Sequence, residues 1–143
     1  MPDRFSFKPA RDVDPVEIVA FWRDNDISLS PTDTAEKLRA AARVNPELFI
    51  VATEGPSGAI AGTVWGNFDG RRGFVVHLAA RRDLRGTGLG RALMDRLEDL
   101  FRERGVHKIH LFVEKTNLEV IGYYRRRGFE VRDDLVILSK TFD

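Results

Sequence analysis

Length, composition and charge narrow the class of this chain before any motif is considered. Its 143 residues suit one compact domain, and 43% hydrophobic with 31% charged residues is typical of a chain that folds. The 23 lysines and arginines nearly balance 22 aspartates and glutamates, which argues against a nucleic-acid partner held by phosphate neutralisation. The chain has no cysteine, so disulfides, thiolate nucleophiles and cysteine-ligated metals are excluded.

Neither a targeting segment nor a membrane partner is predicted. Residues 1–7 lack the basic start and apolar run of a secretory signal, and no apolar stretch approaches the length that crosses a bilayer. The three histidines show no ligand spacing, which predicts no metal site. We therefore expect a cytoplasmic protein.

The first half of the chain predicts a strand, two helices and a meander. Residues 4–8 alternate phenylalanine with polar neighbours, as a half-buried strand does. Asp14-Pro15 marks a helix start, because aspartate caps and proline fits the first helical position. A second helix follows residues 30–33 and stops at Asn45-Pro46. Three strands come next, joined at one end by the hairpin signal Asp69-Gly70, in the ranges 48–53, 59–68 and 73–80.

The second half returns to helical periodicity. Leucines from Leu89 to Leu100 recur at helical spacing, and Gly105 ends that helix. A strand over 108–113 and a short helix from Asn117 to Arg127 follow, and two closing strands are predicted at 129–132 and 135–141. The order β-α-α-β-β-β-α-β-α-β-β defines an α+β fold, with a mixed, largely antiparallel sheet flanked by helices, in a single domain over residues 1–143.

The loop Arg85-Gly86-Thr87-Gly88-Leu89-Gly90-Arg91 lies between a predicted strand and an amphipathic helix. A helix start leaves backbone N–H groups unpaired and carries positive potential, so it attracts anions. The three glycines let a diphosphate approach the backbone without meeting a Cβ, and the two flanking arginines add charged donors. The segment therefore predicts a phosphate-binding loop.

Two other phosphate motifs fit this loop less well. A P-loop needs lysine followed by serine or threonine after its last glycine, where Arg91-Ala92 stands. A dinucleotide fingerprint needs a glycine at position 91, although Glu114 lies roughly where its ribose-binding acid would be. Dinucleotide binding therefore remains an open alternative.

A second constellation runs from Asn117 to Phe129. Asn117 can cap a helix that carries Tyr123 and Tyr124 nearly two turns later. Arg125, Arg126 and Arg127 are individually typical of a solvated face, but together they could help to hold a cofactor phosphate.

Taken together, the two segments resemble the GNAT N-acetyltransferases. Residues 78–80 and 85–90 resemble that superfamily's acetyl-CoA signature, whose core is Gln/Arg-x-x-Gly-x-Gly/Ala, and residues 117–129 resemble its motif Asn-x-x-Ala-x-x-Phe-Tyr-x-x-x-Gly-Phe. Residues 62–73 further resemble a small bacterial subgroup, the YpeA-like acetyltransferases. The resemblance implies an acetyl-CoA-dependent N-acetyltransferase whose acceptor, a primary amine on a small molecule or peptide, is unspecified. It leaves a homodimer open.

The resemblance also implies roles for individual residues. The strand before the loop would offer backbone groups to the pantetheine arm, the loop would hold the diphosphate, and Asn117 would bond to the pantetheine. Tyr124 would be the catalytic residue that protonates the departing thiolate. The implied cofactor site comprises Leu78, Ala79, Ala80, Arg85, Gly86, Thr87, Gly88, Leu89, Gly90, Arg91, Asn117 and Tyr124.

The general base is not evident from the sequence. Counting back from Leu78 in steps of two gives only the apolar Val76 and Phe74. His77 has the opposite parity, so regular alternation predicts that it faces the other side of the sheet as a core or surface residue. His107 and His110 look structural, and the bases that remain are Asp69, Glu114 or a water chain.

The acceptor is expected against the two N-terminal helices and the hairpin loop. These segments present one indole and several carboxylates, which would favour a cationic amine, from Trp22, Asp26, Asp33, Glu36 and Asp69. Without an evident base, a CoA-binding sensor or interaction module that lacks turnover is the alternative to an enzyme.

Overall fold

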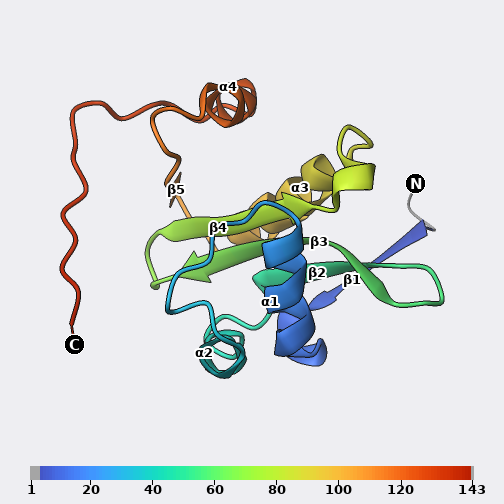
Figure 1. Ribbon diagram of the computed structural model, residues 1–143. Coiled ribbons are helices and arrows are strands. Elements are labelled where there is room, and N and C mark those ends of the chain that lie inside the picture. The colour runs from blue at the N-terminus through green and yellow to red at the C-terminus, as the bar shows by residue number, and fades with distance from the viewer. Residues whose placement is uncertain (1–3, 143) are drawn as a thin grey trace. The chain divides into compact units, whose positions relative to one another are not determined.

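The computed structural model describes residues 4–142, and the chain divides into two units at residue 111 (Figure 1). Over residues 5–111 the first unit contains one sheet, three α-helices and two single 3-10 turns, η2 (Ala10–Asp12) and η3 (Arg82–Leu84). Its elements in chain order are β1 (Phe5–Pro9), α1 (Pro15–Asp24), α2 (Ala35–Ala41), β2 (Phe49–Glu54), β3 (Ala59–Phe68), β4 (Gly73–Ala80), α3 (Leu89–Glu103) and β5 (Ile109–Leu111).

The strands lie in the order β1-β2-β3-β4-β5, and neighbours pair in sequence order. The first three pairings are antiparallel. β4 and β5 run parallel, because α3 returns the chain to the end of the sheet at which β4 begins. The predicted α+β class and the mixed, largely antiparallel sheet are confirmed. The strand predicted over 108–113 is shorter, since it spans only Ile109–Leu111.

Both N-terminal helices begin at capping residues. The Asp14 carboxylate accepts a hydrogen bond from Val16 N at 2.9 Å, and the Thr34 hydroxyl accepts one from Lys37 N at 3.2 Å. These caps satisfy N–H groups that a helix start leaves without partners. The second helix ends at Ala41, a little before the predicted proline stop.

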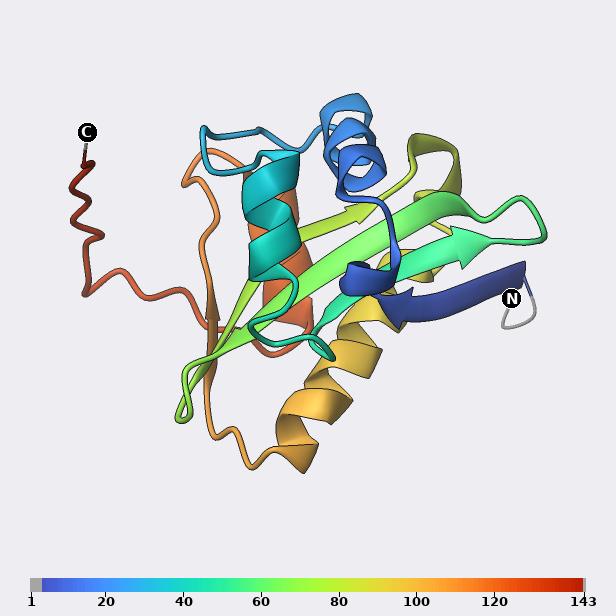
Figure 2. The same ribbon diagram turned by 90° about the horizontal axis from the view of Figure 1, so that it is seen from below.

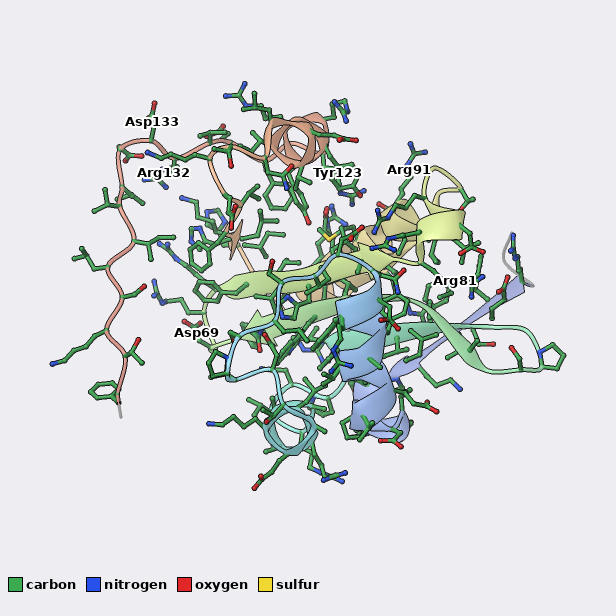
Figure 3. All side chains as sticks on the ribbon, viewed as in Figure 1. Asp69, Arg81, Arg91, Tyr123, Arg132 and Asp133 are labelled. Carbon is green, nitrogen blue, oxygen red and sulfur yellow. The ribbon has the colours of Figure 1, made fainter. Side chains whose placement is uncertain are left out.

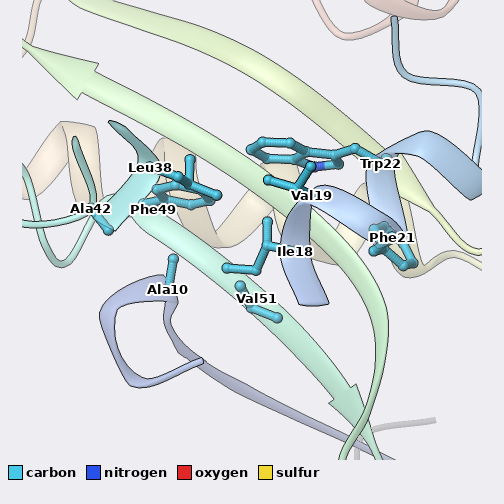
Figure 4. Packing of buried hydrophobic residues seen from close by; sticks show 10 residues of the cluster. Ala10, Ile18, Val19, Phe21, Trp22, Leu38, Ala42, Phe49 and Val51 are labelled. Atoms are coloured by element: carbon cyan, nitrogen blue, oxygen red, sulfur yellow. The ribbon is translucent and has the colours of Figure 1, made fainter. Parts of the chain in front are cut away.

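Helices α1 and α2 cover one face of the sheet, and α3 covers the other (Figure 2). On the first face the indole of Trp22 is stacked on Phe49, whose ring centroid is 6.1 Å away, and Phe49 is stacked on Trp65 at 4.5 Å. Burial of such large rings contributes strongly to core stability. The cluster, drawn in Figure 4, comprises Ala10, Ile18, Val19, Phe21, Trp22, Leu38, Ala42, Phe49, Val51 and Ala79.

A line of glycines on the opposite face lets α3 approach the sheet closely. A Cβ added to Gly62 would lie 2.9 Å from Leu93 Cδ1, and one added to Gly66 would lie 2.5 Å from Leu97 Cδ1. Real Cβ atoms are not found this close to a neighbour, so the α3 leucines occupy the space that a side chain would take. The absence of two side chains thus fixes how near the helix lies.

The second unit, residues 112–142 as described, contains α4 (Leu118–Arg126). Its start agrees with the prediction, because Asn117 Oδ1 accepts a hydrogen bond from Val120 N at 3.3 Å. The two closing strands predicted at 129–132 and 135–141 are not formed: residues 129–142 contain no helix or strand. Large apolar side chains in this stretch are exposed, for example Leu138 at 90%, so no neighbouring strand or core is present to fix an extended conformation.

Candidate active site

A β-bulge interrupts β4 just before the strand reaches the glycine loop. Thr63 on β3 opposes Ala79, whereas Trp65, two residues later, opposes Val76, so two residues of β4 stand opposite one of β3. His77 lies at this point with φ of 50°, a left-handed conformation that costs energy for a residue with a side chain. Bulges of this kind commonly re-aim a side chain next to an active site.

The bulge corrects the parity expected for His77. Regular alternation predicts that Val76 and His77 lie on opposite faces of the sheet. Instead, Val76 shares the face of its partner Trp65. The His77 imidazole packs on that same face, with ring centroids 4.5 Å from the indole of Trp22 and 6.1 Å from that of Trp65. His77 therefore faces the α1 side together with Val76, from which the sequence argument separated it.

Two buried hydrogen bonds hold the backbone of the bulge. Trp22 Nε1 donates to Thr63 Oγ1 at 2.9 Å, and Thr63 Oγ1 donates to the carbonyl oxygen of His77, also at 2.9 Å. The Trp22 and Thr63 side chains are fully buried, so water cannot reach their polar atoms and these two bonds satisfy them instead. The two hydrogen bonds meet at Thr63 and so connect α1, β3 and β4.

The imidazole of His77 makes a close polar contact with Asp33. Nε2 of the ring lies 3.1 Å from Asp33 Oδ1, and the side chains are 22% and 9% exposed. The other Asp33 oxygen, Oδ2, accepts hydrogen bonds from Ser30 N at 2.9 Å and Ser30 Oγ at 3.1 Å. Burial raises the pKa of Asp33, but the bonds from Ser30 and His77 outweigh it and hold that pKa below its ordinary value. The carboxylate is therefore charged near neutral pH.

The glycine loop leads directly into α3. Gly86 and Gly88 have φ of 80° and 96°, conformations that glycine adopts without strain. No side chain caps α3, and its first turn contains no acidic residue. The N–H groups of its first residues therefore have no partner within the helix. Open space surrounds all three loop glycines, since a Cβ at Gly86, Gly88 or Gly90 would meet no atom within 4 Å.

The two arginines that flank the loop differ in their surroundings. Arg85 donates to the backbone oxygen of Asn25 at 3.1 Å and forms an ion pair with Asp26, also at 3.1 Å, so it fastens the loop to the end of α1. Hydrogen bonds from Arg82 and Arg85 lower the pKa of Asp26 to about 2. Arg91 is exposed at the start of α3 (Figure 3), and within residues 4–142 its side chain has no ion pair. Arg91 is thus the flanking cation that a ligand would meet unmatched.

The strand that precedes the loop leaves part of its backbone unpaired. Within residues 4–111, β5 pairs with β4 only from Gly73 to Val75. The stretch 76–80, which includes the predicted site residues Leu78, Ala79 and Ala80, has β3 on one side and no strand on the other. An extended ligand can bond to such an edge as an added strand does.

Asn117 and Tyr124 belong to the second unit. The Asn117 side-chain oxygen caps α4, so it is already used within the helix. The Tyr124 ring lies 5.1 Å from that of Tyr123 and 5.3 Å from that of Phe129, and burial raises the pKa of its phenol. Within residues 112–142 the Tyr124 hydroxyl forms no hydrogen bond, and the hydroxyl that is buried without a partner is that of the neighbouring Tyr123.

Several residues expected near the acceptor or the base have other roles. Trp22 is fully buried and cannot contact an acceptor, which corrects that expectation. Asp69 accepts hydrogen bonds from the backbone of Arg71 and Arg72 at 2.9 and 2.8 Å, which lowers its pKa and makes it a poor base. Asp26 is paired with arginines. Glu36 is exposed on α2.

Between residues 4 and 142, no helix is long and apolar enough to cross a membrane. Nor does that part of the chain bring together three or more metal-ligating side chains. A hollow of about 440 Å³ lies between β1 and the C-terminal half of α3, and none of the predicted site residues lines it.

Solved structures identify the fold. Ard1 from Thermoplasma volcanium superimposes with a TM-score of 0.73 at 26% identity, over 90% of this chain and 84% of that one. The PaiA N-acetyltransferase from Thermoplasma acidophilum, solved in complex with coenzyme A, gives a TM-score of 0.74 at 16% identity, over 90% and 91% of the two chains. The arrangement of sheet, helices and glycine loop is the fold of the GNAT acetyltransferases.

Sequence relatives identify the family. A sequence model of the acetyltransferase (GNAT) family matches residues 16–129. An acetyltransferase of Yersinia enterocolitica is 35% identical over 121 residues, 85% of this chain and 84% of the relative. One of Pectobacterium atrosepticum is 34% identical over 126 residues, 88% of each. The chain belongs to the GNAT family of acetyltransferases, and its activity is acetyl transfer.

Proposed function

We propose that the protein transfers the acetyl group of acetyl-CoA to a primary amine by direct attack, within one domain that includes both units. The observation that carries this proposal is the combination of an unpaired β4 edge with an uncapped helix start beyond it. An extended arm that ends in a diphosphate matches this succession. The open space at Gly86, Gly88 and Gly90 fits a diphosphate against the backbone.

The chain's own groups would divide the work as follows. Backbone groups of residues 78–80 would hold the pantetheine arm, and one of their N–H groups would polarise the thioester carbonyl. Residues 85–91 would hold the diphosphate, with Arg91 supplying the unmatched charge. Binding both reactants in line would supply much of the rate, because it replaces a bimolecular encounter by an oriented one.

Tyr124 is proposed as the acid that protonates the departing thiolate, with Asn117 beside it on the pantetheine. The phenol is protonated throughout the neutral range, so it has a proton to donate. Its place on a capped helix supports this role further, since a helix directs a side chain more firmly than a loop does.

The test is release of free thiol from acetyl-CoA in the presence of an amine. The panel consists of spermidine, L-lysine, kanamycin and a peptide with a free N-terminal alanine, and mass spectrometry identifies the acetylated product. We expect amine-dependent thiol release with at least one member. Acetyl-CoA binding by calorimetry without turnover on any amine would instead indicate a CoA-binding module.

A further inference from the structure

His77 and Asp33 form a polar contact to which the proposed function gives no part. Asp33 lies in the loop between α1 and α2, and His77 lies 44 residues later at the β4 bulge. The indoles of Trp22 and Trp65, whose ring centroids are 6.2 Å apart, both make edge contacts with the imidazole, and His77 directly precedes Leu78 on β4. A strained backbone and a partly buried acid–imidazole pair occur here at one position.

We propose that His77 is the general base of the reaction and that Asp33 is the residue that positions it. This inference rests on the proposed function, because it assigns the proton acceptor that direct attack by an amine requires. It replaces Asp69 and Glu114 as candidates and reverses the expectation that regular strand alternation gave for His77.

The hydrogen bonds of Asp33 determine which ring nitrogen carries the proton. The Asp33 carboxylate is ionised, because the hydrogen bonds that it accepts hold its pKa below its ordinary value. Ser30 donates to Oδ2, so Oδ1 is the oxygen that accepts a hydrogen bond from Nε2–H of His77. The neutral ring then has its lone pair on Nδ1. Within residues 4–142, Nδ1 has no hydrogen-bond partner. An aspartate that fixes the tautomer of an imidazole in this way leaves the other nitrogen ready to accept a proton.

The surroundings of the imidazole hold it rigidly and keep other charges away. Trp22 from α1 and Trp65 from β3 both pack against the ring in edge contacts, and Thr63 donates a hydrogen bond to the carbonyl oxygen of His77. Among the described residues, Asp33 is the titratable group that contacts the imidazole. A site of this kind is positioned before the substrate arrives, which is what proton transfer in a transition state demands.

The proposed step balances as follows. Nδ1 of His77 takes one proton from the ammonium of the acceptor, and the amine lone pair that is released attacks the thioester carbonyl carbon. A C–N bond forms and the C–S bond breaks, its electron pair leaving with the thiolate. The acid of the site protonates that thiolate, and the attacking nitrogen, which still carries two hydrogens, gives one of them through solvent to the deprotonated acid. His77 then returns its own proton to solvent, so that the net products are the amide, the free thiol and one proton.

His77→Gln tests the base, because the glutamine amide can still donate to Asp33 but has no basic nitrogen. With an amine that the parent acetylates, we expect kcat to fall by about 10²–10⁴-fold. Acetyl-CoA affinity and melting temperature should stay close to the parent values. The variant's kcat/KM should rise with pH in proportion to the free amine, a response that a merely structural defect would not give. His107→Gln, at an exposed position, is the matched control and should leave kcat unchanged.

Asp33→Asn tests the positioning role. We expect kcat to fall by up to about 10⁴-fold, the loss known when an aspartate that orients a catalytic histidine becomes asparagine. Long-range ¹H–¹⁵N NMR spectra of the parent should show His77 protonated at Nε2, and the substitution should shift the ring toward the other tautomer. This readout does not depend on turnover.

Three results would overturn the proposal. One is a His77→Gln enzyme that turns over within about threefold of the parent, far below the range of general base catalysis. Another is a parent protein whose His77 is protonated at Nδ1 at neutral pH. If the parent binds acetyl-CoA but acetylates no amine, the proposed function itself fails and the assignment of the base falls with it.

Discussion

Replacing Gly62 with alanine would test the close approach of α3 to the sheet at the end nearest the glycine loop. The added Cβ would lie 2.9 Å from the backbone oxygen of Ala79, 2.9 Å from Leu93 Cδ1 and 3.2 Å from Leu89 Cδ2. A backbone oxygen within a paired strand cannot move alone, and both leucines are fully buried. The methyl group therefore has to push β4 and the first turns of α3 apart.

The expected cost follows from two opposing terms. Overpacking of a dense core costs about 1–3 kcal/mol. Alanine recovers about 0.5–1 kcal/mol, because it lowers the conformational entropy of the unfolded chain. The net destabilisation is about 1–2 kcal/mol, and at about 4 °C per kcal/mol for a chain of this size the melting temperature should fall by about 4–8 °C.

Thermal unfolding followed by circular dichroism measures this change, with Gly122→Ala as the matched control. A Cβ at Gly122 would meet only the mobile end of Arg126, at 3.3 Å, so alanine should stabilise α4 by up to about 1 kcal/mol. Acetyl-CoA affinity of the Gly62 variant should also weaken, because the displaced elements carry the proposed site. A Gly62→Ala protein that melts at or above the parent temperature would refute the close packing of α3.

Three further predictions concern the loop, the acid and pH. Gly88→Val should abolish most acetyl-CoA affinity in calorimetry. Gly70→Val is the control, because its φ of 97° is close to the 96° of Gly88 and its surroundings are equally open, so it should carry the same strain and bind normally. Equal affinities of the two variants would show that the diphosphate does not bind at this loop. Tyr124→Phe should lower kcat by about 10²–10⁴-fold while Tyr123→Phe does not, and equal rates for the two would make Tyr124 a packing residue. The pKa of Asp26 is lowered to about 2 in the folded chain, so its ion pairs stabilise the protein at any pH above the pKa of the unfolded chain, and this contribution is lost as pH falls from about 4 to 2. The free energy of unfolding of Asp26→Asn should therefore depend less on pH in that window. An unchanged acid transition would contradict the ion pairs seen here.

The elements that the sequence predicts well are those with local signals. Asp14-Pro15 and Asn117 begin helices through contacts within three residues, and both caps are present. The closing strands are the opposite case, because Leu135 to Thr141 has the composition of a strand but a strand exists only through its partner. Nothing within a short window reports whether a partner edge is available.

The site divides in the same way. The glycine loop is recognisable because glycine spacing and backbone conformation are locally coupled, as at Gly86 and Gly88. The position of His77 was mispredicted, since a single inserted residue reverses strand parity and no glycine or proline marks this bulge. Its pairing with Asp33 joins residues far apart in the chain. Counting alternate residues along β4 gives the wrong face for His77 beyond the inserted residue, so it could not have found that contact.

The salt bridges between the loop and the end of α1 affect the thermodynamics of ligand capture. Fixing one flexible residue costs about 1–2 kcal/mol of conformational entropy, and a free glycine loop would incur that loss each time a ligand entered. Here Arg82 and Arg85 form ion pairs with Asp26, which fix the start of the loop before any ligand arrives. Because Arg85 is already neutralised, long-range attraction of an anion falls mainly to Arg91 and the helix start. Association should therefore slow with added salt only to the shallow degree that about one unmatched cation produces.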